Sequence, residues 1–173
     1  MDFSSLIESR RSVRKFQSKP VDDAILQRIL DAANSAPSAG NLQAYEIVVV
    51  RDEETRKALA AASHGQEMIA QAPVALVFFA NPSRSSKKYG ERGSSLYCIV
   101  DASIAVSYAQ LAIANEGLGT VWVGAFDDDE VRKITNAPAA LIPVAILPVG
   151  YAAEKPDKKP RRTVRDLVKQ EHF

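Results

Sequence analysis

The sequence predicts an α+β fold in which helices cover a layered sheet. Two observations indicate this: apolar residues recur at helical spacing in several segments, and short apolar runs rich in valine and isoleucine lie between those segments. With 173 residues, 46% of them hydrophobic, the chain can bury one core, since domains commonly have about 100–150 residues. We therefore expect a single domain over residues 1–173. The order of the strands does not follow from the sequence.

The first elements are two helices. One includes Leu6 and Ile7 and leads into an arginine-rich turn. The second has Asp22 as its N-cap, ends before Pro37, and repeats apolar residues at helical spacing: Ile25, Leu26, Ile29, Leu30 and Ala33.

Apolar runs then predict two strands with a helix between them. The first strand is Glu46–Arg51, the short helix is Glu53–Ala62, and the second strand is Val74–Ala80. The following stretch, Asn81–Ser95, is polar and rich in serine and glycine, so we expect a mobile loop. Its charged residues could close over a ligand, although a plain solvated loop is the favoured interpretation.

The segment Leu96–Glu116 predicts a long helix with little polar face. A helix of about 20 residues is about 30 Å long, and a domain this small has difficulty covering it on every side. We therefore expect a second copy of the chain to cover its exposed face.

Three elements complete the prediction. A strand at Thr120–Gly124 follows two glycines, a capped helix covers Asp127–Thr135, and a last strand covers Ile142–Val149. That strand tolerates Pro143 only near its edge or start. A basic tail ends the chain.

Charge and composition exclude several classes of function. The 22 basic and 21 acidic residues give no field that would attract nucleic acid or an anionic membrane, so a small neutral partner is expected. The start of the chain, MDFSSLIESRR, lacks a signal peptide's apolar stretch, which favours a cytoplasmic location. A single Cys98 predicts a buried thiol, and His64 and His172 alone do not suggest a metal site.

The densest functional signal is the basic run Arg10–Phe16. Its guanidinium groups offer paired donors to phosphate oxygens, and the hydroxyl of Ser12 adds a neutral hydrogen bond. Taken alone, a solvated basic turn is the favoured interpretation. The loop Ala36–Gln43 is the second signal, because its small residues leave room for a flat ligand and Asn41 and Gln43 supply donors and acceptors.

The glycines of Gly117–Phe126 resemble a dinucleotide fingerprint but lack its context. They follow a helix and enter a strand, whereas the fingerprint leaves a strand and opens a helix. Gly124 and Ala125 instead offer unhindered backbone N–H groups at a strand end. The tail could lie along a phosphate, although a frayed terminus is slightly favoured, and its basic residues are Lys155, Lys158, Lys159, Arg161, Arg162 and Arg165.

The order of these segments is more specific than any one of them. The runs RRSVRKF, APSAGNLQAYEIVVV and GLGTVWVGAF, with a long apolar helix containing Asp101 and a late basic strip, resemble the FMN-dependent nitroreductase family over nearly the whole chain. The resemblance implies a three-layer fold with a central, mostly antiparallel sheet flanked by helices. It also implies that the long helix is the dimer helix and that Asp101 is a structural partner.

The resemblance also assigns a cofactor site. Arg10, Ser12 and Arg14 match flavin-binding positions, with Arg11 contributing from the same turn. The loop of the other subunit would lie against the ring, and its residues would be Pro37, Ser38, Ala39 and Asn41, with Gln43 nearby. Gly124 and Ala125 would direct N–H groups toward N5 and O4 of the flavin. Arg161, helped by Lys159 or Arg162, would hold the phosphate.

The implied activity is the reduction of nitroaromatic, quinone or related acceptors by NADH or NADPH through two hydride transfers on FMN, with the two sites of a homodimer at its interface. The flavin performs the chemistry, so no side-chain acid or base is required. Alternatives are a specialised relative, such as a reductive dehalogenase or a peptide dehydrogenase, and a protein that binds FMN without catalysis or is an interaction domain without flavin. The segment between Ala80 and Leu96 is short for the family, which leaves the choice of substrate open.

Overall fold

The chain forms a four-stranded sheet in which all neighbouring strands are antiparallel. The computed structural model describes residues 2–173. The strand order is β1 (Tyr45–Val50), β2 (Val74–Ala80), β4 (Ile142–Gly150) and β3 (Gly119–Thr120). The predicted α+β class is confirmed, and β2 covers the residues predicted for it.

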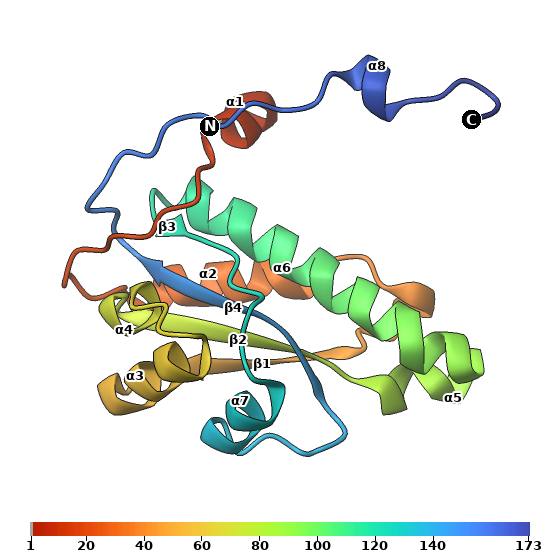
Figure 1. The fold of residues 1–173 in the computed structure, drawn as a ribbon, viewed down its shortest axis with the longest axis horizontal. Coiled ribbons are helices and arrows are strands. Elements are labelled where there is room, and N and C mark those ends of the chain that lie inside the picture. Colours follow the sequence, from red (N-terminus) through yellow and green to blue (C-terminus); the bar gives the residue numbers. More distant parts are fainter. Residues whose placement is uncertain (1) are drawn as a thin grey trace.

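Helices cover both faces of the sheet, which gives three layers (Figure 1). Leu76 and Phe78 of β2 share one core with the first helical layer, and Val77 and Phe79 share a second core with the other layer. Because neighbouring strand residues point to opposite faces, all of β2 is buried. The first layer is α2 (Asp23–Asn34) and α6 (Cys98–Asn115), and the second is α3 (Glu53–Ala62), α4 (Met68–Gln71) and α7 (Asp128–Ile134).

Aspartate side chains begin three of these helices. Asp22 accepts the N–H of Ala24 at 2.8 Å, and Asp127 accepts the N–H of Glu130 at 2.9 Å. Asp52 caps α3 in the same way. Each carboxylate satisfies a backbone donor that has no partner within its helix. The predicted starts of α2 and α7 are therefore confirmed.

The polar stretch Asn81–Ser95 is helical, so the prediction of a mobile loop was wrong. Helix α5 spans Pro82–Arg92, and a π-helical turn, Gly93–Tyr97, joins it to α6. Asn81 accepts the N–H of Arg84 at 3.2 Å, and the proline occupies the first turn, where its missing N–H does no harm. The serines and glycines that weaken an isolated helix are overridden here by tertiary packing, since Ser85 is fully buried.

Strand β3 is shorter than the predicted Thr120–Gly124 because of a proline in β4. Val123 and Ile146 exchange both backbone hydrogen bonds, at 3.0 and 2.9 Å. The next pair that should exchange hydrogen bonds lies two residues further along each strand, and it consists of Val121 and Pro148. Proline has no N–H to donate. The ladder is interrupted there. Pro143 lies near the start of β4, as predicted, where the register with β2 shifts.

Helix α6 is the long apolar helix that the sequence predicts. Seven of its residues are buried, and they face α2 and the sheet. By length and composition alone, the continuous stretch Pro82–Asn115 could cross a membrane. Seven buried residues of α6 instead belong to the core between the helices and the sheet, as those of a core helix do. The other face of α6 leaves Val100 43% exposed and Tyr108 40% exposed.

The segment before α2 and the segment after β4 lie side by side beyond the edge of the sheet at β3. Helix α1 (Phe3–Ser9) leads into the basic turn, and the segment that leaves β4 passes close to it. The tail then extends away from the sheet with the short helix α8 (Val164–Leu167), as Figure 1 shows. All residues from Asp157 to Phe173 are exposed.

Candidate functional site

The basic turn after α1 is attached to β3. Val13 donates its backbone N–H to Thr120 at 3.0 Å, and Ser12 forms a parallel bridge with the same residue. Val13 is buried on Gly119, where an added Cβ would lie 2.8 Å from the valine side chain. A glycine is therefore needed for the turn to approach the strand. The arginines on either side of Val13 are consequently held in fixed backbone positions.

The segment after β4 is paired with the same turn. Gln17 donates its N–H to Tyr151 at 2.9 Å, and Ala153 donates to Lys15 at 2.8 Å. The carboxylate of Glu154 accepts the N–H of Arg14 at 2.5 Å and that of Lys15 at 3.2 Å. These bonds join residues that are about 140 positions apart in the sequence. They bring the late basic strip alongside the early one.

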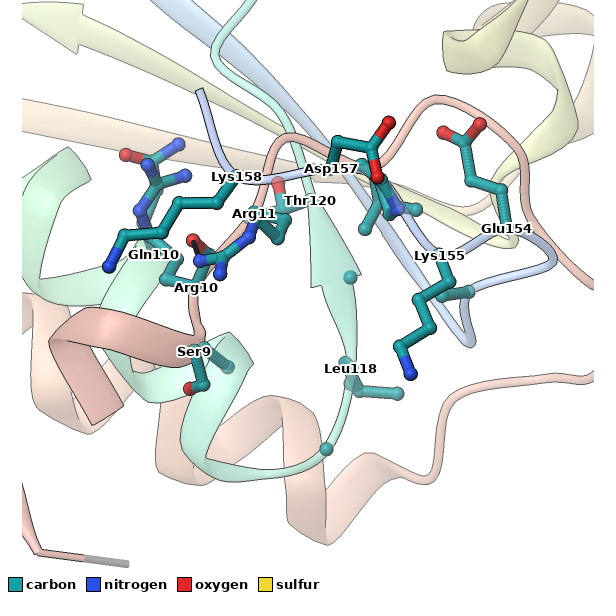
Figure 2. Close-up of a pocket in the computed structure, with 16 residues that line it drawn as sticks. Ser9, Arg10, Arg11, Gln110, Leu118, Thr120, Glu154, Lys155, Asp157 and Lys158 are labelled. Carbon is teal, nitrogen blue, oxygen red and sulfur yellow. Dashed lines mark hydrogen bonds between the residues drawn. The ribbon is translucent and has the colours of Figure 1, made fainter. Parts of the chain in front are cut away.

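Two adjoining hollows result from this pairing. The first, of about 450 Å³, is lined by residues predicted to bind the flavin or its phosphate: Arg10, Arg11, Ser12, Arg14, Lys159 and Arg161. The second, of about 580 Å³, continues toward α6 and Leu118, and Figure 2 shows Arg10, Lys155 and Lys158 around it. Both hollows include Arg10, Arg11 and the segment 156–158.

The charges in the hollows are mainly positive. Burial lowers the pKa of Arg10, and the guanidinium groups of Arg161 and Arg11 lower it further. Such crowding disfavours the protonated form, and an anion between the groups would relieve it. The acidic residues that line the hollows, Glu8, Glu154 and Asp157, are fewer than the basic ones and do not neutralise them in full.

A buried hydroxyl also lines the larger hollow. Thr120 is 2% exposed, and among residues 2–173 its side-chain oxygen has no hydrogen-bond partner. Buried polar atoms are almost always satisfied in folded proteins. Thr120 is therefore available as a donor or acceptor to a bound molecule. Thr120 could not be predicted from the sequence, since a threonine at a strand end has no distinctive pattern.

The loop predicted to contact a flat ligand lies elsewhere in the chain. It connects α2 to β1 and contains a short 3₁₀ turn, Ala39–Asn41. The backbone N–H of Ala39 donates to the buried carboxylate of Asp101 at 2.9 Å, and that of Gln43 donates to the hydroxyl of Ser38 at 2.9 Å. Asp101 therefore has a structural contact with the loop, as the resemblance implies.

Within one chain the loop and the basic hollow are not brought together. The hollow lies beside β3 and the C-terminal half of α6, whereas a separate hollow of about 180 Å³ is lined by Pro37, Ser38, Ala39 and the N-terminal half of α6. Asn41 accepts a weak hydrogen bond from Gln43 at 3.4 Å, and both residues have positive φ. The loop conformation is thus set by its own contacts and not by the basic turn.

The third predicted segment leaves the sheet after Val123. Gly124 and Ala125 are exposed, and the structure records no acceptor for the N–H of either within the described chain. The carbonyl of Ala125 accepts a hydrogen bond from the side chain of Gln66 at 3.1 Å. Gln66 was missed from the sequence because the contact joins two loops. Arg162, predicted as a phosphate ligand, donates to the carbonyl of Asp166 next to α8 and does not line the hollow.

The chain is similar to known proteins over most of its length. A sequence profile described as the nitroreductase family matches residues 7–67 and 64–151. An NADH dehydrogenase of Thermus thermophilus is 32% identical, over 90% of this chain and 89% of its own length. An FMN reductase [NAD(P)H] of Bacillus subtilis is 33% identical, over 96% of this chain and 72% of its own.

A solved structure shows the same arrangement of elements. It is an NADPH:FMN oxidoreductase from Vibrio harveyi complexed with NAD⁺, and it superimposes with a TM-score of 0.90 at 27% identity. The alignment covers 98% of this chain and 77% of the other.

Proposed function

The chain belongs to the nitroreductase family, and from that premise we propose that it is an FMN-dependent oxidoreductase in which NADH or NADPH reduces nitroaromatic, quinone or related acceptors. The names of the Bacillus and Vibrio relatives support both FMN and NAD(P)H. When bound, the flavin supplies the redox chemistry by accepting a hydride from the reductant and passing it to the acceptor in turn.

The observation that carries this proposal is the convergence of cations from both ends of the chain on one hollow. A phosphate needs several charge-assisted donors, and guanidinium groups provide them in pairs. Arg10, Arg14 and Arg161 line the hollow of about 450 Å³, together with Lys159. Burial and the neighbouring guanidinium groups lower the pKa of Arg10, and a bound dianion would favour its charged form again. The residues present therefore fit the phosphate of FMN.

The rest of the flavin would be held by neutral groups. The hydroxyl of Thr120, which has no hydrogen-bond partner within residues 2–173, and that of Ser12, which lines the smaller hollow, can bond ribityl or ring oxygens. The N–H groups of Gly124 and Ala125 would approach the N5 and O4 edge, where negative charge increases on reduction and donors stabilise it. The Gln66 side chain would keep this turn in place through its bond to Ala125. No side-chain acid or base is required.

The wall of the site would come from a second copy of the chain. In one copy the Pro37–Gln43 loop lies apart from the basic hollow. The exposed apolar residues of α6, Val100 and Tyr108, together with Leu96 beside it, are a surface that another α6 could cover. A homodimer with two flavin sites at its interface would satisfy both observations. We also propose a single domain over residues 1–173 and a cytoplasmic location.

The test is a spectrum of the purified protein with FMN. The protein is incubated with FMN, desalted, and titrated anaerobically with NADH and then NADPH, while its mass in solution is measured. Retained flavin bands that bleach, in a particle of twice the chain mass, are expected. A colourless protein after desalting would refute the cofactor site, and a monomer with full activity would refute the shared site.

Acceptors separate the proposed activity from specialised relatives. Nitroaromatics, quinones and halogenated phenols are each added to the reduced protein, and reoxidation is followed in a stopped-flow instrument. Fast reoxidation by nitroaromatics and quinones is expected. Fast reoxidation by halogenated phenols alone, with release of halide, would indicate a reductive dehalogenase instead.

A further inference from the structure

We propose that the side chains at the junction of α5 and α6 bind the anionic group of an aromatic substrate. Four residues form this group, which we call the α5 cluster: Lys88, Tyr89, Arg92 and Tyr97. The inference rests on the proposed function, because it requires the Pro37–Gln43 loop to face a flavin. Binding of an anion can nevertheless be measured without turnover, so the two proposals can fail separately.

The α5 cluster is a packed arrangement of two rings and two cations. The rings of Tyr89 and Tyr97 meet edge to face, with centroids 5.1 Å apart. The ammonium of Lys88 lies 5.4 Å from the Tyr89 ring, and the guanidinium of Arg92 lies 5.4 Å from the Tyr97 ring. Arg92 also donates to the Tyr97 hydroxyl at 3.1 Å. Each cation is therefore oriented by an aromatic side chain.

Neither cation of the α5 cluster has a carboxylate partner. Within residues 2–173 every ion pair involves other residues, including Lys57 and Lys133 on α3 and α7. Helix α5 carries four basic residues against one acidic residue, Glu91. Cations without counter-charges generate a positive potential that attracts anions and raises their local concentration.

The cluster is fixed against the Pro37–Gln43 loop. At Gly40, with φ of 58°, a Cβ would lie 2.5 Å from the Tyr89 hydroxyl and 2.7 Å from the Lys88 ammonium. Arg84, one helical turn before the cluster, donates to the carbonyl of Leu42 at 3.0 Å. A ligand that lies on this loop would thus also lie close to the α5 cluster.

An aromatic ring would fit beside the cluster. Tyr97 lines the hollow of about 180 Å³ whose other walls are Pro37–Ala39 and the α6 residues Val100, Asp101 and Ile104. The Pro37–Ala39 wall of this hollow is proposed to lie against the flavin ring, so an aromatic substrate stacked on that ring would lie near Tyr97. The carboxylate of Asp101 also lines this hollow and would repel an anion, so the charged substituent is expected to point out of the hollow, toward Lys88 and Arg92.

The test compares two nearly isosteric ligands on the oxidised, FMN-loaded dimer. Nitrobenzoate carries a charge and nitrobenzamide does not, and their dissociation constants are measured from the flavin difference spectrum and by calorimetry. The wild type is expected to bind nitrobenzoate more tightly. The double variant K88M/R92M should lose about tenfold in affinity for nitrobenzoate, about threefold for each exposed charge, and change within about twofold for nitrobenzamide.

Lys87→Met is the matched control, because it removes a charge from the same helix but outside the cluster, and it should leave both constants unchanged. Equal binding of the two ligands by the wild type would overturn the proposal. So would an equal loss for both ligands in the double variant, since that would indicate damage to the loop.

Half-reactions identify which substrate carries the anion. Slower flavin reduction by NADH or NADPH in the double variant would assign the cluster to the phosphates of the reductant. Slower reoxidation by nitrobenzoate, but not by nitrobenzamide, would assign it to the acceptor. A flavin that NAD(P)H does not reduce, with anion selectivity intact, would refute the proposed function alone. Normal turnover without anion selectivity would refute the α5 cluster alone.

Discussion

Replacing Glu154 tests whether the two ends of the chain build the cofactor site together. Its carboxylate accepts the N–H groups of Arg14 and Lys15, and thereby ties the basic turn to the segment that carries Lys159 and Arg161. An acid beside a phosphate site should weaken phosphate binding through repulsion. Its hydrogen bonds should strengthen binding, because they place the cations. The two effects have opposite signs, and their magnitudes decide the outcome.

The hydrogen bonds are the larger effect. A hydrogen bond to a charged acceptor contributes about 1.5–3 kcal/mol, and the second bond, at 3.2 Å, is near the long end of the usual range. Their loss in Glu154→Ala should cost about 2 kcal/mol. Across water, two unit charges repel by only about 1 kcal/mol even at a separation of about 4 Å. If most of the loss falls on the bound state, the Kd for FMN rises by about tenfold or more. Glu154→Gln keeps an acceptor and removes the charge, so its Kd should stay within about threefold of the wild type.

The assay is quenching of FMN fluorescence on binding, with thermal unfolding of each apoprotein as a check on folding. Glu130→Ala, which removes an exposed acid on α7, is the control and should leave the Kd unchanged. An alanine variant that binds FMN as tightly as the wild type, or more tightly, would refute the positioning role. Equal weakening by alanine and glutamine would also refute it, because keeping a hydrogen-bond acceptor at this position would then make no difference.

Three further predictions follow from the site and the core. Arg14→Ala should weaken FMN binding by about 1.5–3 kcal/mol through loss of a charge-assisted hydrogen bond, and an unchanged Kd beside a control such as Lys133→Ala would remove Arg14 from the site. Gly124→Pro removes a proposed backbone donor, so flavin reduction should slow by more than the melting temperature falls, and a normal reduction rate would exclude Gly124. Cys98 is fully buried, and burial raises the pKa of its thiol, so less thiolate forms at a given pH. Iodoacetamide at about pH 8 should therefore label Cys98 only after denaturation. Rapid labelling of the native protein would contradict its burial.

The parts of the fold that local patterns specify were predicted well. Asp22 and the apolar spacing after it predict α2, and the valine-rich run at Val74–Ala80 predicts β2, because in both places propensity and burial agree. The prediction failed for α5, whose serines and glycines favour a loop until tertiary contacts hold them. It also overestimated β3, because the interruption depends on Pro148, which is distant in sequence and whose register opposite Val121 cannot be read from either segment.

In the candidate site too, features that depend on local sequence were predicted, and features that depend on long-range contacts were not. The arginines of the turn after α1 and the lysines of the tail are visible as runs of charge, and they do line one hollow. Glu154 and Gln66 are not visible, because their partners lie far away in the sequence and only the folded chain brings them together. Thr120 was also missed, since what distinguishes it is an unsatisfied hydroxyl in a buried place.

Helix α6 connects the two halves of the proposed site. Near its start Asp101 holds Ala39 of the Pro37–Gln43 loop, and nearer its end Gln110 and Ala114 line the larger basic hollow. In a dimer packed through the exposed face of this helix, the loop of one copy would therefore reach the hollow of the other only at one register of the two helices. A shift by one turn would move the loop by about 5.4 Å, more than a stacking contact with a flavin ring tolerates. The apolar residues of that face, Val100 and Tyr108, would then set the geometry of the site as directly as the arginines that bind the phosphate.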